Sequence, residues 1–459
     1  MIFILLFTVF FGYLLFRQYT GSGKLPPGPL ALPIIGNIPQ LAYYIWREKG
    51  IVPAFDLFRK KYGNVFTLWV GPFPHVSICD YNTNQEVFVK NGNRYKNRLL
   101  PPIFDHLSEG HGLVFSNGEI WAEMRRFTLL TLRNMGVGRD VMEEKIMEEL
   151  DARCEDLNLQ AVDGITIVNT SELFNVTVGS IINSMLVGKR FDEHNMHEFN
   201  RLQQLVHDSG EVFTPFDLTT PVWILKYFFP KRYRLVMDSM LAVNEYVARE
   251  AKQRFEDLKN GLYELDRENP NDFVDAFLAK MEKNEDNPAY SMKSLEFVLA
   301  DLWSAGQDTT STTLTSGFNK LVNNPEVIKK VREELLKVTD NGSRPLSLKD
   351  KTRTPYFNAT LAEIQRCASI GNVSLWKTSE GKTTVNGYEL GDGVILTSQL
   401  GALHINENVF ENPEKFHPER FIENEKLLHQ LIPFGIGKRS CIGENLARSE
   451  LYLVKSLFG

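Results

Sequence analysis

Apolar residues recur at helical spacing through most of this chain and alternate at strand spacing in only a few short windows. The strand-like windows are rich in β-branched and aromatic residues: Val65–Gly71, His75–Tyr81 and Val385–Thr397. The helical windows are longer, and proline-containing segments separate them: residues 119–323, 324–340, 355–367 and 443–458. The pattern therefore predicts a mainly α protein with a small β part.

The first apolar stretch, Ile2–Phe16, contains no charged residue and as a helix would be about 23 Å long, against about 30 Å for a bilayer core. A cleaved secretory signal is one interpretation, but no basic residue precedes the stretch and no A-x-A-like cleavage site follows it. Arg17 and the stiff turn Pro26–Pro29 favour a retained anchor with the body in the cytosol. We therefore expect residues 1–23 to be a signal anchor and linker, and residues 24–459 to be one large domain.

A second apolar stretch, Pro221–Pro230, lies between two helical windows and is rich in aromatic residues. Two interpretations stay open for it. It is either a buried connection between helices or a second contact with a membrane surface.

The charge balance and the cysteine positions exclude several classes of function. With 51 basic and 57 acidic residues the net charge is −6, so no general basic field favours nucleic acid as a partner. The four cysteines are far apart and form no C-x-x-C pair: Cys79, Cys154, Cys367 and Cys441. This spacing excludes the usual zinc motifs and argues against a disulfide framework.

The glycine-rich segment Phe434–Gly443 precedes the last predicted helix and contains Cys441. It has neither the spacing of a phosphate-binding P-loop nor the glycines of a dinucleotide loop. A nucleophilic cysteine would need a base, and the segment contains no histidine; a buried structural cysteine is a further alternative. A metal-bound thiolate fits best, because backbone N–H groups at a helix N-terminus stabilise a thiolate. Arg439 could then pair with an anionic cofactor edge such as a haem propionate.

The segment follows the pattern F-x-x-G-x-R-x-C-x-G at every fixed position. In this pattern the chain resembles the cytochrome P450 superfamily, and the resemblance extends from Lys24 onward. It implies the cytochrome P450 fold and haem b as the cofactor, with Cys441 as the axial ligand of the haem iron. It also implies that Phe434, Arg439 and Gly443 help to bind the haem.

The segment Ala305–Thr310 resembles the family's oxygen-activating stretch in its long central helix. By itself, a run of Asp, Thr and Ser is a poor helix interior and is equally typical of a helix cap. The resemblance implies that Gly306 leaves room for dioxygen and that the Thr309 hydroxyl donates a hydrogen bond to it. It also implies that Asp308 relays protons inward.

Further residues match the family in order along the chain. Glu363 and Arg366 resemble its E-x-x-R pair, and Arg420 lies in the segment whose arginine completes a Glu–Arg–Arg network with a structural role. Taken alone, an i, i+3 pair of opposite charges is more typical of a surface salt bridge. Trp121 and Arg125 match the W-x-x-x-R helix, in which both residues contact haem propionates.

Lys377 stands where relatives often carry His or Arg against a propionate, and lysine keeps the charge without the fork geometry.

Three other basic residues, Arg126, Lys438 and Arg448, are candidates for a patch that docks an acidic electron donor. The alternative is that they are solvated surface charges.

The resemblance implies a haem-thiolate monooxygenase of the animal microsomal type, anchored in the endoplasmic reticulum membrane with its catalytic domain in the cytosol. It would insert one atom of O2 into a lipophilic small molecule such as a xenobiotic, a fatty acid or a steroid. Because no flavin or nicotinamide motif is present, we expect electrons from a separate NADPH–cytochrome P450 reductase, with cytochrome b5 as a further partner. The expected pocket walls are mostly apolar: Phe104–Leu113, Leu202–Val212, Phe297–Ala305 and Val373–Leu375.

The chain departs from the family at its end, 18 residues after Cys441, where relatives continue into a β element that lines the substrate pocket. We expect the lack of this element to weaken haem binding and turnover. One alternative is therefore a truncated, catalytically impaired haem-binding protein. Another is a haem-thiolate isomerase or dehydratase that needs no reductase, although the Asp308–Thr309 pair argues against it.

Overall fold

The structure, a computed structural model, describes residue 12, residues 25–137 and residues 140–455. The chain divides into two compact units, residues 1–99 with 362–441 and residues 100–361 with 442–459. Apart from residue 12, the predicted anchor lies outside the described residues. Among those residues, no helix combines the length and the apolar character needed to cross a bilayer.

The first unit contains the small β part. Its strands are β1 (Val65–Val70), β2 (Phe73–Ile78), β3 (Lys377–Thr378), β4 (Thr383–Val385), β5 (Tyr388–Leu390) and β6 (Ile395–Ser398). Four of them form a sheet in the order β1-β2-β6-β3, while β4 and β5 form a separate hairpin. β1 and β2 are antiparallel with Val65 opposite Ile78, and β2 runs parallel to β6 with His75 opposite Ile395. The two strands predicted at 65–71 and 75–81 are therefore confirmed.

The third predicted strand, Val385–Thr397, is wrong as a single element. The chain turns at Asn386-Gly387, where both residues have positive φ as a tight hairpin turn requires, and β5 follows. A second turn at Gly391–Gly393 then separates β5 from β6. Glycines inside an apolar window were thus turn signals and not strand positions.

Alternation along β1 places apolar side chains on both faces of the sheet. Val65 belongs to a cluster with Phe88, whereas Phe66 and Leu68 pack with Phe58. The helices of this unit are α2 (Ile38–Arg47), α3 (Ile51–Tyr62), α4 (Tyr81–Asn84), η1 (Gln85–Lys90), η2 (Gly92–Tyr95), α17 (Leu400–His404), α18 (Arg420–Glu423) and α19 (Lys426–Gln430).

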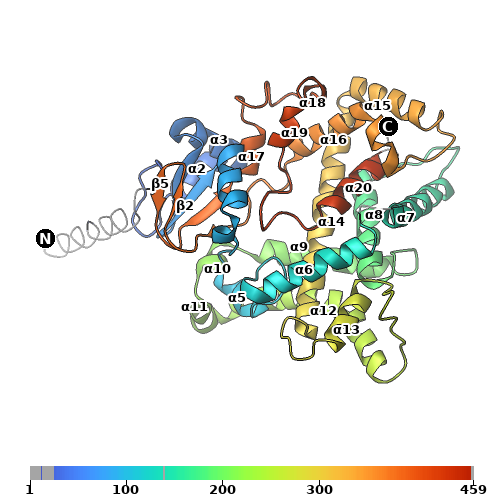
Figure 1. The fold of residues 1–459 in the computed structure, drawn as a ribbon, viewed down its shortest axis with the longest axis horizontal. Coiled ribbons are helices and arrows are strands. Elements are labelled where there is room, and N and C mark those ends of the chain that lie inside the picture. The colour runs from blue at the N-terminus through green and yellow to red at the C-terminus, as the bar shows by residue number, and fades with distance from the viewer. Residues whose placement is uncertain (1–11, 13–24, 138–139, 456–459) are drawn as a thin grey trace. The chain divides into compact units, whose positions relative to one another are not determined.

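The second unit is helical throughout its regular structure. Its helices are α5 (Pro102–Ser108), α6 (Gly118–Asn134), α7 (Asp140–Leu159), α8 (Thr170–Val187), α9 (Met196–Val212), α10 (Pro215–Thr219), α11 (Val222–Phe228), α12 (Pro230–Lys259), α13 (Phe273–Glu282), α14 (Met292–Val322), α15 (Pro325–Val338), η3 (Leu348–Arg353), α16 (Pro355–Ala368, whose end belongs to the first unit) and α20 (Glu444–Lys455). The long helix α14 is contacted by α8, α12, α15 and α20 (Figure 1). The predicted helical windows are confirmed over the described residues, and with them the mainly α fold class.

The segment Pro221–Pro230 is not the buried connection that one interpretation expected. It contains α11, of which only Leu225 is buried. Trp223, Tyr227 and Phe228 are 58%, 75% and 69% exposed. Large apolar side chains therefore gather on the surface of the second unit at this point.

Candidate functional site

The loop that carries Cys441 takes its path from two glycines in the left-handed region. Gly435 and Gly437 have φ of +66° and +84°. A Cβ at Gly437 would collide with the carbonyl oxygen of Phe88 in η1, so only glycine permits this close approach. The N–H of Cys441 donates to the carbonyl of Phe434 (2.9 Å), which fixes the backbone at the sulfur. Cys441 itself is exposed.

Three basic side chains of the first unit act on one another near this loop. Lys377 and Arg98 face each other across an isolated β-bridge, and the buried Arg439 donates from Nε to the carbonyl of Lys96 (2.6 Å). Burial, together with the charges of Arg98 and Arg439, lowers the pKa of Lys377 to about 7. A buried ammonium next to two guanidinium groups is stabilised by an anion, so this cluster is suited to an anionic group.

Sequence reasoning missed Arg98. The residues around it carry no motif, and its relation to Lys377 is a pairing between segments 279 positions apart (98 and 377) that only the fold creates. The expected anion-binding pair Lys377 and Arg439 is thus a cluster of three cations.

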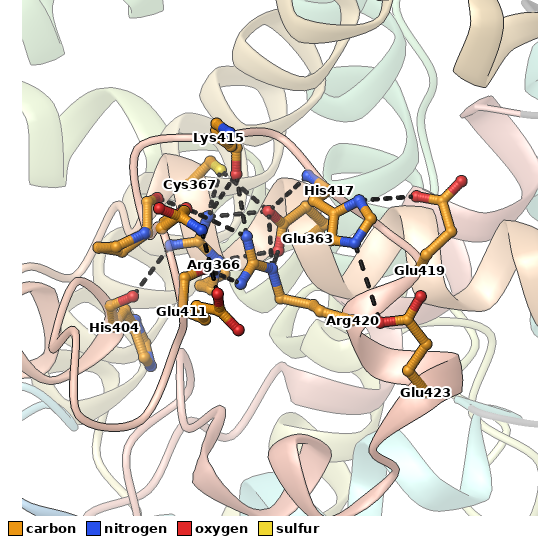
Figure 2. A network of polar contacts seen from close by, with 12 residues as sticks. Glu363, Arg366, Cys367, His404, Glu411, Lys415, His417, Glu419, Arg420 and Glu423 are labelled. Carbon is orange, nitrogen blue, oxygen red and sulfur yellow. Dashed lines mark hydrogen bonds and ion pairs between the residues drawn. The ribbon is translucent and has the colours of Figure 1, made fainter.

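Glu363, Arg366 and Arg420 come together in a buried network (Figure 2). Arg366 makes a forked ion pair with Glu363, with Nε and Nη2 each 2.8 Å from a carboxylate oxygen. Arg420 reaches the same carboxylate at 3.3 Å, and the N–H of His417 donates to it at 2.9 Å. The default interpretation of an exposed surface pair is wrong here, because the Glu363 and Arg366 side chains are 0% exposed.

The same two arginines bind backbone carbonyls of a segment that has little regular structure. Arg366 donates to the carbonyls of His404 (3.0 Å) and Pro413 (2.8 Å), and Arg420 donates to that of Glu411 (2.6 Å). The guanidinium groups therefore donate to backbone carbonyls that would accept from backbone N–H groups in a helix or a sheet.

In the second unit, Gly306, Asp308 and Thr309 lie near the middle of α14. The Thr309 hydroxyl donates to the carbonyl of Ala305 (2.7 Å), a bond within the helix. A Cβ at Gly306 would lie 2.8 Å from Cδ1 of Ile182 on α8. Gly306 therefore allows close packing of two helices, in addition to the space for dioxygen that the resemblance implies.

Asp308 faces a polar cavity of about 800 Å³. The cavity lies among three helices of the second unit: α14 contributes Asp308, Ser311 and Thr315, α8 contributes Asn175, and α9 contributes Gln203 and His207. Desolvation by the surrounding protein raises the pKa of Asp308 although the cavity reaches its side chain. The segment 202–212 was expected to form an apolar pocket wall, but it presents mostly polar residues to this cavity.

Trp121 and Arg125 lie one turn apart on α6, with Trp121 buried and Arg125 half-buried. Two of the three candidates for a basic docking patch have carboxylate partners. Arg126 pairs with Glu123 at 2.7 Å, and Arg448 pairs with Glu444 at 2.9 Å. These pairs reduce the positive field that the two arginines offer to a partner.

Sequence reasoning also missed Glu450 on α20. Its residue is 1% exposed, its carboxyl is hydrogen-bonded to the side chain of Thr310 on α14, and within the described part of the chain its Oε1 has no hydrogen-bond partner. Burial raises the pKa of Glu450 to about 8. The burial of Glu450 could have been predicted from the sequence, because Glu450 is spaced from Leu446 and Leu453 so that all three share one face of the helix, and this face is buried.

We expect Glu450 to make the folded state more stable at low pH than at high pH. Between its ordinary pKa of 4.5 and the folded value of about 8, the folded protein binds the proton and the unfolded chain does not. The free energy of unfolding should therefore fall by up to about 1.4 kcal/mol per pH unit in this range because of this group. Glu450→Gln should make the melting temperature less dependent on pH between pH 5 and 8. Glu444→Gln at the start of α20 serves as control. Equal pH slopes in wild type and Glu450→Gln would contradict the assignment.

The comparisons with known proteins decide the family. A sequence profile described as "Cytochrome P450" matches residues 26–457. The chain is 50% identical over 459 residues to the probable cytochrome P450 cyp-35D1 of Caenorhabditis elegans, covering 99% of this chain and 92% of that protein. It is 34% identical to cytochrome P450 2C3 of Oryctolagus cuniculus, covering 96% and 88%, and to cytochrome P450 2C55 of Rattus norvegicus with the same coverage. The chain belongs to the cytochrome P450 family.

As a cytochrome P450 it is an oxidoreductase of a monooxygenase family, and its cofactor is haem b. The residues of the first unit fit this cofactor. The buried Lys377 and Arg439 together with the half-buried Arg98 are suited to the propionate carboxylates of haem b, and the exposed Cys441 offers a sulfur on a fixed backbone. The match to the Caenorhabditis elegans protein covers 99% of this chain and 92% of that protein, so it gives no support to the impaired activity expected from the short C-terminal segment.

Proposed function

We propose that this protein is a haem-thiolate monooxygenase that inserts one oxygen atom from O2 into a lipophilic small molecule. The observation that carries the proposal is the Cys441 loop, whose glycine path and backbone hydrogen bonds hold an exposed sulfur two residues after Arg439, a member of the cation cluster. When bound, haem b supplies the redox chemistry, and a thiolate ligand favours O–O cleavage.

The residues divide into three roles. Cys441 would bind the haem iron through its sulfur, with Phe434 and Gly443 shaping its loop. Arg98, Lys377 and Arg439 would hold propionates, and the resemblance assigns the same role to Trp121 and Arg125. Glu363, Arg366 and Arg420 keep the segment behind the cysteine loop in place. Binding and support are thus assigned to separate sets of side chains.

Asp308 and Thr309 move protons in this proposal. Desolvation raises the pKa of Asp308, which favours uptake of a proton by its carboxyl from water in the cavity that it lines. The Thr309 hydroxyl, which donates to the Ala305 carbonyl, is free to donate elsewhere after rotation of its side chain. Gly306, which packs against Ile182 of α8, lies one turn before this hydroxyl, and the space for dioxygen assigned to it follows from the resemblance.

Thr309→Ala should leave haem binding intact and divert reducing equivalents from product to peroxide. The hydroxyl is assigned to proton delivery and makes only one intrahelical hydrogen bond, so its loss should change stability by less than about 1 kcal/mol. The measurement is product and peroxide formed per NADPH consumed, with Thr313→Ala, which loses a similar bond to the Thr309 carbonyl, as control. Unchanged coupling in Thr309→Ala would remove Thr309 from the mechanism.

The electron donor is proposed to be NADPH–cytochrome P450 reductase, with cytochrome b5 as a second partner, because the sequence has no flavin or nicotinamide motif.

The protein is proposed to reside at the endoplasmic reticulum membrane through residues 1–23. The exposed aromatic residues of α11 support a second contact with the bilayer, since Trp and Tyr favour the membrane interface.

Deletion of residues 1–23 should therefore release the protein from membranes only in part. Combining the deletion with Trp223→Ser and Phe228→Ser should release most of the remainder, because these side chains are 58% and 69% exposed and supply apolar contact area. Sedimentation with vesicles of neutral phospholipid measures the bound fraction. A fully soluble single deletion would exclude α11 as a membrane contact.

The test of the proposed function is a sequence of three measurements on the purified full chain. The absorption spectrum of the reduced carbon monoxide complex reports thiolate ligation. NADPH consumption with added reductase then reports electron transfer, and oxidised product from lipophilic probes reports monooxygenation. A thiolate-type spectrum without NADPH consumption or product would instead support an impaired haem-binding protein.

A further inference from the structure

The short helix α17 supports the segment that leads into the Cys441 loop through its last residue, His404. The N–H of Ile432 donates to Nε2 of the His404 ring (3.2 Å), and both residues are buried. A buried backbone N–H needs an acceptor inside the protein, so the imidazole takes the place that a carbonyl has in a helix or a sheet. Ile432 precedes Cys441 by only nine positions (432 and 441).

The two contacts of the His404 ring determine which of its nitrogens carries the proton. Nε2 accepts from an amide that can only donate, so Nε2 has no proton. In the neutral ring the proton is therefore on Nδ1, which lies 3.0 Å from the hydroxyl of Ser369 and donates to it. Burial, together with the charge of Arg366, lowers the pKa of His404 to about 3, so the ring stays neutral and keeps its acceptor at physiological pH.

Ser369 presents its hydroxyl to the ring from an uncommon backbone conformation. It directly follows the end of α16 and has a φ of +37°, in the left-handed region where helices usually end on glycine. Its N–H donates to the carbonyl of Gln365 (3.0 Å), which closes the last turn of the helix. Glycine would adopt this conformation with less strain but would supply no hydroxyl. The imidazole is thus oriented by side-chain and backbone partners at both nitrogens.

His404 also belongs to the buried glutamate–arginine network. Its backbone carbonyl accepts from Nη1 of Arg366 (3.0 Å), and Figure 2 shows His404 at one side of the network. The rest of α17 adds apolar contacts to the same segment. A buried cluster contains two leucines of the helix and the residue that the ring holds, with Ile436 packed against it: Leu400, Leu403 and Ile432.

Backbone hydrogen bonds continue from Ile432 to the cysteine. The carbonyl of Ile432 accepts from the N–H of Gly435 (3.0 Å), and the carbonyl of Phe434 accepts from the N–H of Cys441 (2.9 Å). These two bonds join the residue held by the ring to the residue that carries the sulfur. A shift of the Ile432 backbone would therefore move the hydrogen-bonded turn on which the position of the sulfur depends.

We propose that His404 is a positioning residue, whose neutral ring holds the Ile432 backbone and through it keeps the Cys441 sulfur where it can bind the haem iron. This inference rests on the proposed function, because it takes Cys441 as the ligand of the iron. His404 acts through the backbone of residues 432–441, and not on the iron or the substrate. Its loss should make the thiolate ligand easier to displace.

The test compares three replacements of His404 in the full-length holoenzyme. In His404→Gln the amide lies about as far along the side chain as Nε2, so it can still accept from Ile432. In His404→Asn the amide lies at the level of Nδ1 and can reach only Ser369. His404→Leu keeps a similar volume but neither contact. The control is His429→Leu, which replaces an exposed histidine three positions before Ile432 (429 and 432).

The first arm measures amide hydrogen exchange. His404→Leu and His404→Asn should speed exchange of the Ile432 amide by about ten- to a hundredfold, because a buried N–H is left without its acceptor, and exchange at Gly435 and Cys441 should also rise. His404→Gln should stay within about threefold of wild type at all three amides, and His429→Leu should match wild type.

The second arm measures the rate at which the reduced carbon monoxide complex loses its thiolate-type spectrum. This rate reports the iron–sulfur bond and not the overall fold. It should rise by about tenfold in His404→Leu and His404→Asn and remain close to wild type in His404→Gln and His429→Leu. If His404→Leu does not fold, the comparison of His404→Gln with His404→Asn decides, since both side chains are polar amides that differ by one methylene group.

The outcomes separate this inference from the proposed function. Unchanged exchange at Ile432 in His404→Asn and His404→Leu would overturn the contact, and faster exchange with an unchanged rate of thiolate loss would overturn the positioning role. Equal losses in His404→Gln and His404→Asn would show that the acceptor at Nε2 is not what matters. A wild-type protein without a thiolate-type carbon monoxide spectrum would reject the proposed function, and with it the role at the iron, while the exchange arm would still decide whether His404 holds the loop.

Discussion

Replacing Cys441 with serine should abolish the thiolate-type spectrum of the reduced carbon monoxide complex and reduce monooxygenation to background. A serine hydroxyl is a far weaker electron donor to iron than a thiolate, and it remains protonated near neutral pH. The substitution changes one atom on an exposed side chain, and the loop around it is held by backbone contacts. Gly437, Phe88 and the Cys441–Phe434 hydrogen bond are all kept. The loss of function should therefore come without a loss of fold.

The control for this experiment is Cys154→Ser. Cys154 is half-buried on α7, and its replacement should leave the spectrum and the activity at wild-type levels. Circular dichroism and the melting temperature of both variants check that the fold is intact. A Cys441→Ser protein that retains the thiolate-type spectrum would show that another cysteine is the ligand.

Glu363→Ala should be the most destabilising of the substitutions considered in this protein. It removes the carboxylate that two buried guanidinium groups share, with contacts of 2.8 Å from Arg366 and 3.3 Å from Arg420. Breaking a buried pair by removing one partner costs about 3–5 kcal/mol, because the remaining charge is left without compensation. Since a folded domain is stable by only about 5–15 kcal/mol, the variant should lose haem and much of its folded population at 37 °C.

Two graded variants make this prediction specific. Glu363→Gln keeps the shape and one acceptor oxygen and should fall between wild type and Glu363→Ala. Glu256→Ala removes an exposed carboxylate paired with Lys259 at 3.3 Å and should change stability by less than about 1 kcal/mol. Urea unfolding and haem retention measure the series. If Glu363→Ala and Glu256→Ala were equally stable, the network would have no structural role.

The fold class was predictable because apolar residues recur at helical spacing through most of the chain. β1 and β2 were predictable because two short windows rich in β-branched and aromatic residues flank the turn residues Gly71-Pro72. The window 385–397 failed because its apolar residues outweighed glycines that form turns at positive φ. Pairwise relations within one helix, such as Glu363 with Arg366, could be read from spacing. Their burial could not, since it depends on carbonyls contributed by residues 404–415.

The residues that sequence reasoning missed have partners far away in the chain. Arg98 lies opposite Lys377 across an isolated β-bridge, and Glu450 is hydrogen-bonded to the side chain of Thr310, 140 positions earlier (450 and 310). Neither residue lies in a motif, and a pairing between positions so far apart leaves no pattern in the sequence around either of them. Contacts between distant segments are therefore the part of a site that only a structure reveals.

The carbonyl contacts of Arg366 and Arg420 also restrict how residues 405–419 can change length. Loops usually tolerate insertions and deletions, because few of their backbone groups have fixed partners. In this segment the carbonyls of Glu411, Pro413 and Lys415 each meet a guanidinium donor at a set distance. Adding or removing one residue would shift these carbonyls out of register with side chains anchored elsewhere. A stretch that lacks long helices and strands is thus held to one length as strictly as a strand in the middle of a sheet.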